Sequence, residues 1–106
     1  MIAKTPPPPY YAVIFTSIRT PLDQGYHEMA EAIIKLAAQQ KGFLGVESAR
    51  NELGITVSYW ESLETIKQWK ENVEHQIARE KGRSLWYQTF TVRIAKVEQD
   101  YRFEKE

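Results

Sequence analysis

The residues best suited to chemistry lie between Gly54 and Tyr87, where all three tryptophans and one of the two histidines occur. His75 is a candidate proton-transfer group, because the reference pKa of histidine is about 6.5. The other interpretation is a helix-terminal histidine that caps carbonyl groups of its own turn. Trp69 lies on the expected inner face of a helix, where it is either a core residue or the wall of an aromatic pocket.

Two arginines and two aromatic residues beyond His75 complete the set of candidates. Arg79 and Arg83 are four residues apart, so they share a helical face and could hold an anionic or phenolate substrate. The alternative is a solvated charged face. Trp86 and Tyr87 are expected to open the last strand on opposite faces, so that one of them lines the same cavity as Trp69.

Alternation and helical spacing predict the elements that position these residues. Gly54 is followed by a strand in which Tyr59 and Trp60 point to opposite faces, and Ser62 is a plausible N-cap for the next helix. We expect that helix to pause near 72–74 and to resume through 76–85, which would turn His75 back toward the cavity. The other expected elements are strands at 11–19, 43–50 and 86–97 and a helix at 26–40.

This order of elements, β-α-β followed by β-α-β, predicts the α+β ferredoxin-like split βαβ fold, with helices on one face of an antiparallel sheet. The other sheet face would carry Tyr, Phe and Val side chains, too apolar to leave in water. We therefore expect a homodimer that packs sheet against sheet. Residues 1–9 are expected to form a proline-rich lead-in, and residues 10–106 a single domain.

Several of these residues occur in an order that resembles the antibiotic biosynthesis monooxygenase family of dimeric α/β-barrel proteins. The matching residues are Gly42-Phe43-Leu44-Gly45-Val46-Glu47-Ser48, Tyr59-Trp60-Glu61-Ser62, Trp69, His75, Gly82-Arg83 and Trp86-Tyr87. Lys41 stands where the family often has proline. The resemblance implies a cofactor-independent monooxygenase for a small quinol or phenol-like substrate. It implies His75 and Trp69 as catalytic residues, and Trp60, Arg83, Trp86 and Tyr87 as substrate-binding residues.

Composition argues against several other classes of function. Fourteen basic and fourteen acidic side chains give a net charge of zero, without the basic excess that nucleic-acid binding needs. There is no cysteine, and two histidines 48 positions apart are no metal-ligand signature. Glycine-rich phosphate loops are absent, so no metal, flavin or other cofactor is expected. With no apolar run long enough to cross a membrane, we expect a cytoplasmic protein.

Two alternative functions remain open at this level. A haem-degrading member of the superfamily would need a histidine about ten residues after Trp69, where Arg79 stands, and an asparagine on the first strand, where Thr16 and Ser17 stand. The second alternative is a non-catalytic dimer that binds a small apolar ligand, because a fold does not fix a function.

Overall fold

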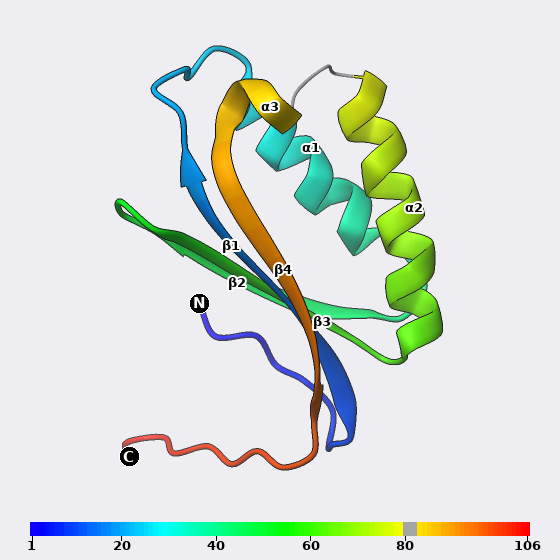
Figure 1. The fold of residues 1–106 in the computed structure, drawn as a ribbon. Helices are drawn as coiled ribbons and strands as arrows, with labels where there is room; N and C mark the ends of the chain where they lie inside the picture. Colours follow the sequence, from blue (N-terminus) through cyan, green and yellow to red (C-terminus); the bar gives the residue numbers. More distant parts are fainter. Residues whose placement is uncertain (80–82) are drawn as a thin grey trace.

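The computed structural model describes residues 1–79 and 83–106, and the side chains of all of these except 75–79 and 83–84. Its elements follow the predicted order (Figure 1). They are β1 (Tyr10–Arg19), α1 (Tyr26–Ala38), β2 (Phe43–Arg50), β3 (Gly54–Trp60), α2 (Leu63–Arg79), α3 (Arg83–Trp86) and β4 (Tyr87–Val97).

The four strands form one antiparallel sheet in the order β2-β3-β1-β4. Figure 1 shows α1 and α2 side by side on one face of this sheet, while both chain termini lie on the other side. The predicted α+β ferredoxin-like fold is confirmed. Among the described residues, no helix is long and apolar enough to cross a membrane.

The register of the strands places side chains in rows across the sheet face that the helices cover, because paired residues share a face. Four rows matter for the site, and each runs in the order β2, β3, β1, β4. They are Arg50–Gly54–Ser17–Phe90, Ser48–Thr56–Phe15–Val92, Val46–Ser58–Val13–Ile94 and Phe43–Trp60–Tyr11–Lys96.

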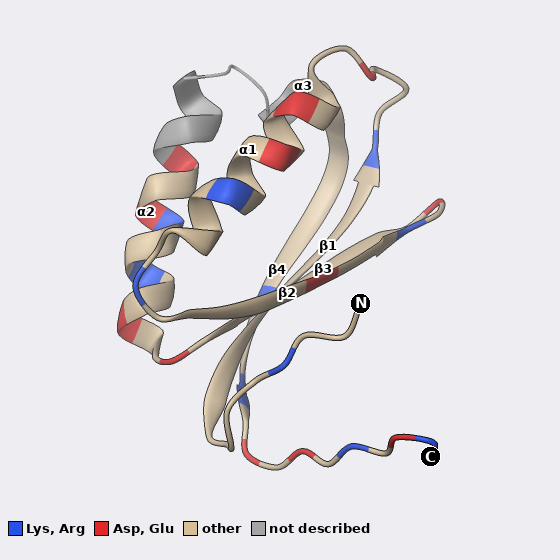
Figure 2. Ribbon diagram, turned by 180° about the vertical axis from the view of Figure 1, so that it is seen from behind, with Lys and Arg blue, Asp and Glu red and all other residues tan. Residues whose placement is uncertain are grey.

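The helices bury one face each and expose charged residues on the other. Ala37 of α1 packs with Ile66 and Trp69 of α2 and Trp60 of β3 in the core. The charged side chains that the structure describes on the two helices, among them Glu28 and Lys35 on α1 and Glu64 and Lys67 on α2, are exposed (Figure 2). This pattern is typical of amphipathic helices on a sheet.

The helix α2 begins as predicted but does not break where we expected. The Ser62 hydroxyl accepts a hydrogen bond from the Thr65 amide (3.1 Å), and the Thr65 hydroxyl oxygen accepts one from the Ser62 amide (3.3 Å). This reciprocal cap satisfies amides of the first turn. The predicted pause at 72–74 is wrong, since α2 continues to Arg79. Asn72 instead donates to the Gln40 side chain (2.8 Å), so its amide does not compete with the helix backbone.

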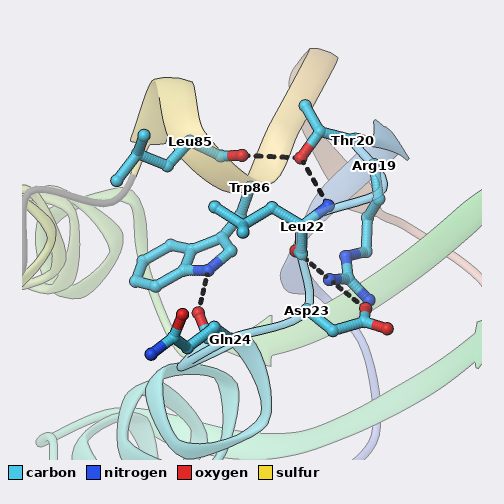
Figure 3. Close-up of polar contacts among 7 residues, drawn as sticks. All are labelled: Arg19, Thr20, Leu22, Asp23, Gln24, Leu85 and Trp86. Carbon is cyan, nitrogen blue, oxygen red and sulfur yellow. Dashed lines mark hydrogen bonds and ion pairs between the residues drawn. The ribbon is translucent and has the colours of Figure 1, made fainter.

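The prediction that Trp86 opens the last strand is also wrong. Trp86 is the last residue of α3, and β4 begins at Tyr87. The buried indole of Trp86 donates to the carbonyl oxygen of Gln24 (2.9 Å), and the Thr20 hydroxyl donates to the carbonyl oxygen of Leu85 (2.6 Å) (Figure 3). These bonds hold α3 against the β1–α1 loop and fix the point at which β4 starts.

The two terminal segments are tied to the sheet face opposite the helices. The Ala3 amide donates to Glu47 Oε2 (2.9 Å), and the Tyr10 hydroxyl donates to the Asp100 carboxylate. Tyr10 is buried at the start of β1. The lead-in of residues 1–9 thus runs against the sheet over at least part of its length.

Candidate functional site

A cavity of about 560 Å³ lies between the helix pair and the rows of side chains on the sheet. Its wall is formed by α1 and α2, including Met29, Ile33, Ile66 and Trp69. The β4 side is open: Val92 and Ile94 line the cavity, yet their side chains are 48% and 51% exposed. Apolar side chains that line a cavity and still face solvent are a typical ligand entrance.

One end of the cavity is closed by tryptophan. Trp69 and Trp60 are stacked with ring centroids 5.7 Å apart, and Phe43 meets Trp60 edge to face. Trp60 is fully buried and donates its indole N–H to the Ser58 hydroxyl (2.9 Å). Trp69 therefore presents an aromatic surface to the cavity, while Trp60 stacks against the Trp69 ring and is itself shielded from the cavity.

The other end holds a cluster of four aromatic side chains. Tyr87 meets Phe15, Tyr26 and Phe90 with ring centroids 5.4 to 6.0 Å apart. Burial raises the pKa of Tyr87 well above its usual range, and a hydrogen bond with Tyr26 adds to this increase. Tyr87 therefore stays protonated at neutral pH and is a hydrogen-bond donor, not a base.

Two arginines lie beside this aromatic cluster. Arg50 lines the cavity and donates to the buried hydroxyl of Ser17. Arg19 lies over the Tyr26 ring at 3.4 Å from its centroid, and pairs with Asp23 at 2.8 Å. Its Nε is buried without a hydrogen-bond partner among the described residues. The rows of Gly54 and Trp60, which mark the two ends of the cavity, are about 20 Å apart along β3.

This arrangement suits a flat, apolar ligand with a polar group at one end. The floor offers Phe15, Val13 and Val92 to an aromatic ring, and the Arg50 end offers a guanidinium group and phenolic hydroxyls. Hydrogen bonds from charged or neutral donors in a site partly shielded from water stabilise an anion. The titratable side chains that α2 adds to the described lining are Lys70 and Glu74.

The predicted site residues divide into three groups. Trp69 and Tyr87 line the cavity. Trp60 and Trp86 are buried, but neither is among the lining residues that the structure describes. The side chains of His75 and Arg83 lie outside the described residues. Because α2 has no turn after Val73, the expected reason for His75 to face the cavity does not hold for the main chain.

Sequence reasoning missed Arg50 and Tyr26. Tyr26 begins α1 on the side that faces the sheet, and no spacing in the sequence distinguishes its hydroxyl from an ordinary core aromatic residue. Arg50 and Gly54 flank the short connection 51–53, and a hairpin of that length pairs them directly. An arginine paired with a glycine on the next strand could have indicated that the Arg50 side chain crosses the sheet.

The fold is similar to that of solved structures that include a cofactor-independent oxygenase and putative antibiotic biosynthesis monooxygenases. SnoaB, a cofactor-independent oxygenase from Streptomyces nogalater, superposes with a TM-score of 0.66 at 7% identity, over 92% of this chain and 100% of that chain. A putative antibiotic biosynthesis monooxygenase from Bordetella bronchiseptica gives a TM-score of 0.65 at 15% identity, over 90% and 100% of the two chains. At these identities the likeness shows a shared fold.

The family is shown by a sequence relative. The chain is 54% identical over 106 residues to YqjZ, an uncharacterized protein of Bacillus subtilis (strain 168), covering 98% of this chain and 93% of that protein. The chain belongs to the same family as YqjZ. No family model matches the chain.

Proposed function

We propose that the protein is a member of the antibiotic biosynthesis monooxygenase family that oxidises a small quinol or phenol-like substrate without metal, flavin or haem. The observation that carries this proposal is the cavity itself, with an apolar floor and two tyrosine hydroxyls and Arg50 gathered at one end. The shared fold with SnoaB, a cofactor-independent oxygenase, supports it.

The proposed reaction draws its electrons from the substrate. Loss of a proton gives a phenolate, which is electron-rich enough to reduce O₂. One oxygen atom enters the ring and the other leaves as water, while the phenol loses four electrons and becomes a quinone. The protein has to exclude water, remove the proton and stabilise the anion. Tyr87 is proposed to donate to the phenolate oxygen, and Trp69 to contact the ring.

His75 is proposed as the proton acceptor and Arg83 as a further substrate-binding residue, whereas Trp60 and Trp86 are proposed to act through the residues that they contact. The buried positions of Trp60 and Trp86 favour indirect roles for these two: Trp60 supports the ring of Trp69, and Trp86 fixes the start of the strand that carries Tyr87.

The deciding experiment is oxygen consumption by chelator-treated, colourless protein with a panel of quinols and phenols. We expect turnover without added cofactor. His75→Ala should slow turnover by roughly two to four orders of magnitude if His75 is the general base. His27→Ala is the matched control, because His27 is exposed on α1. Trp69→Phe should mainly weaken binding, since it keeps an aromatic ring but removes the N–H donor and part of the aromatic surface.

Two results would contradict this proposal. Activity that requires haem or flavin would refute the cofactor-free reaction. No oxygen uptake with any substrate would favour the second candidate, a non-catalytic dimer that binds a small apolar ligand. The described lining supports that candidate, because it is mostly apolar.

The haem-degrading alternative is less well supported by the first strand. Ser17, which stands near the expected asparagine position, already accepts a hydrogen bond from Arg50. Thr16 pairs with Ile55 and Thr91, so it belongs to the sheet face opposite the helices. Neither hydroxyl is therefore free in the cavity to replace the asparagine.

A further inference from the structure

Arg50 is held in place by the strand that lies next to it. It ends β2 directly opposite Gly54, and its guanidinium group lies over that glycine. A Cβ atom added at Gly54 would lie only 2.1 Å from Arg50 Nη2. The absence of a side chain at residue 54 therefore gives the guanidinium room to cross the sheet and reach Ser17, which is 2% exposed.

The charge of Arg50 is not neutralised within the described part of the chain. A guanidinium group has five N–H donors, and the bond from Arg50 to Ser17 uses one of them. No described carboxylate lies within ion-pair distance of Arg50, whereas Arg19 has Asp23. The simplest interpretation is a solvated arginine at the end of a hairpin, but its bond to a buried serine and its place in the cavity lining give it a defined direction.

The neighbours of Arg50 suit the same kind of ligand. Tyr26 and Tyr87 also line this end of the cavity, and Phe15 and Phe90 form its apolar surface. Both arginines act on Tyr87 to lower its pKa, against the larger effect of burial. The end of the cavity is thus a positive region that contains phenolic donors and is bordered by aromatic rings.

We propose that Arg50, positioned by Ser17 and Gly54, binds a carboxylate group of the ligand, so that the preferred substrates are aromatic hydroxy acids, not neutral phenols. A guanidinium fork matches the two oxygens of a carboxylate, and a neutral phenol leaves that fork unused. This inference depends on the proposed function only in that the substrate occupies the cavity.

The test is equilibrium dialysis at neutral pH with two probes that differ by one carboxylate, 6-hydroxy-2-naphthoate and 2-naphthol. We expect the wild-type protein to bind the acid at least about tenfold more tightly than the naphthol, which is typical of a hydrogen bond to a charged group. Arg50→Gln should abolish this preference. Arg93→Gln should keep it, because Arg93 pairs with Ile14 and belongs to the opposite sheet face.

A second variant moves the guanidinium without removing its charge. Gly54→Ala adds a methyl group where the Arg50 side chain now lies, and this flexible side chain has to shift. We expect Gly54→Ala to reduce the preference for the acid while a thermal melt confirms that the protein is folded. A lysine at residue 50, Arg50→Lys, should retain only part of the preference because it lacks the fork.

Three outcomes would overturn the inference: equal binding of both probes by the wild type, an unchanged preference in Arg50→Gln, or binding of neither probe. Dialysis involves no turnover, so its result is separate from the oxygen-consumption test. Binding that depends on Arg50 without any oxygen uptake would support this inference and contradict the proposed oxygenase. Oxygen uptake with neutral phenols alone would support the proposed oxygenase and contradict this inference.

Discussion

At the residue scale, a tyrosine and a glutamate on the open sheet face adjust each other's ionisation. The Tyr59 hydroxyl donates to Glu47 Oε1 at 2.6 Å. Burial raises the pKa of Tyr59 to about 12, and the bond to Glu47 adds to the increase. In turn, the bonds from Tyr59 and from the Ala3 amide lower the pKa of Glu47. The folded state thus favours neutral Tyr59 and ionised Glu47.

This pair predicts how stability depends on pH. The Tyr59 contribution is complete below about pH 10 and is lost as the pH rises through the folded pKa of about 12. The Glu47 contribution is complete above 4.5, the ordinary value, and is lost as the pH falls through its lowered folded pKa. Tyr59→Phe should lower the free energy of unfolding by about 1 kcal/mol at neutral pH. It should also reduce the loss of stability at both high and low pH.

Urea unfolding of wild type and Tyr59→Phe across the pH range measures this effect. Tyr101→Phe is the control, because Tyr101 is 98% exposed in the C-terminal segment. If Tyr59→Phe has the same pH profile as the wild type, the Tyr59–Glu47 bond contributes nothing in solution.

Individual site residues were predictable from the sequence where one element decides their position. Trp69 follows Ile66 at helical spacing, so its inward direction comes from α2 alone. Arg50 could not be identified in this way, because its role depends on the pairing of two strands and on a glycine in the second strand. The sequence likewise does not show that Trp69 lines the cavity while Trp60 is buried behind it, because this depends on how the two rings stack.

At the element scale, the strands and helix starts followed local signals, and the errors arose from tertiary contacts. The strand β2 occupies the predicted range of 43–50. The expected break in α2 at 72–74 is absent, and the side chain of Asn72 bonds there to Gln40, just after α1. A contact between α2 and the segment after α1 cannot be read from either segment alone.

The N-cap of α2 gives a prediction for this scale. Ser62→Ala should lower the free energy of unfolding by about 1 kcal/mol, because the Thr65 amide loses its acceptor. Ser62→Asp should recover most of the loss, since aspartate is also a good N-cap and favours the positive end of the helix. Denaturant unfolding at neutral pH measures both variants. Equal stability of Ser62→Ala and wild type would show that the cap is unimportant.

At the scale of the whole molecule, the sheet face away from the helices has a mixed composition. The sequence argument placed tyrosine, phenylalanine and valine there. In the structure Phe15, Phe43 and Phe90 all belong to rows on the helix side. Tyr10, Tyr59 and Val57 do lie on the open face, as expected. The centre of this face on β1 and β3 is aliphatic and consists of Ile14, Ile18, Ile55 and Val57, of which Ile18 and Ile55 are more than 40% exposed.

We predict that this aliphatic centre joins two copies of the chain, because exposed isoleucines on adjacent strands favour burial against a second sheet. Light scattering at micromolar concentration should give twice the mass of one chain. Ile14→Lys should shift the protein toward monomer, since it places a charge on the strand between Val57 and Arg93. Leu63→Lys, on the exposed start of α2, is the matched control and should remain dimeric. A monomeric wild type, or a dimer broken only by Leu63→Lys, would contradict this sheet-to-sheet arrangement.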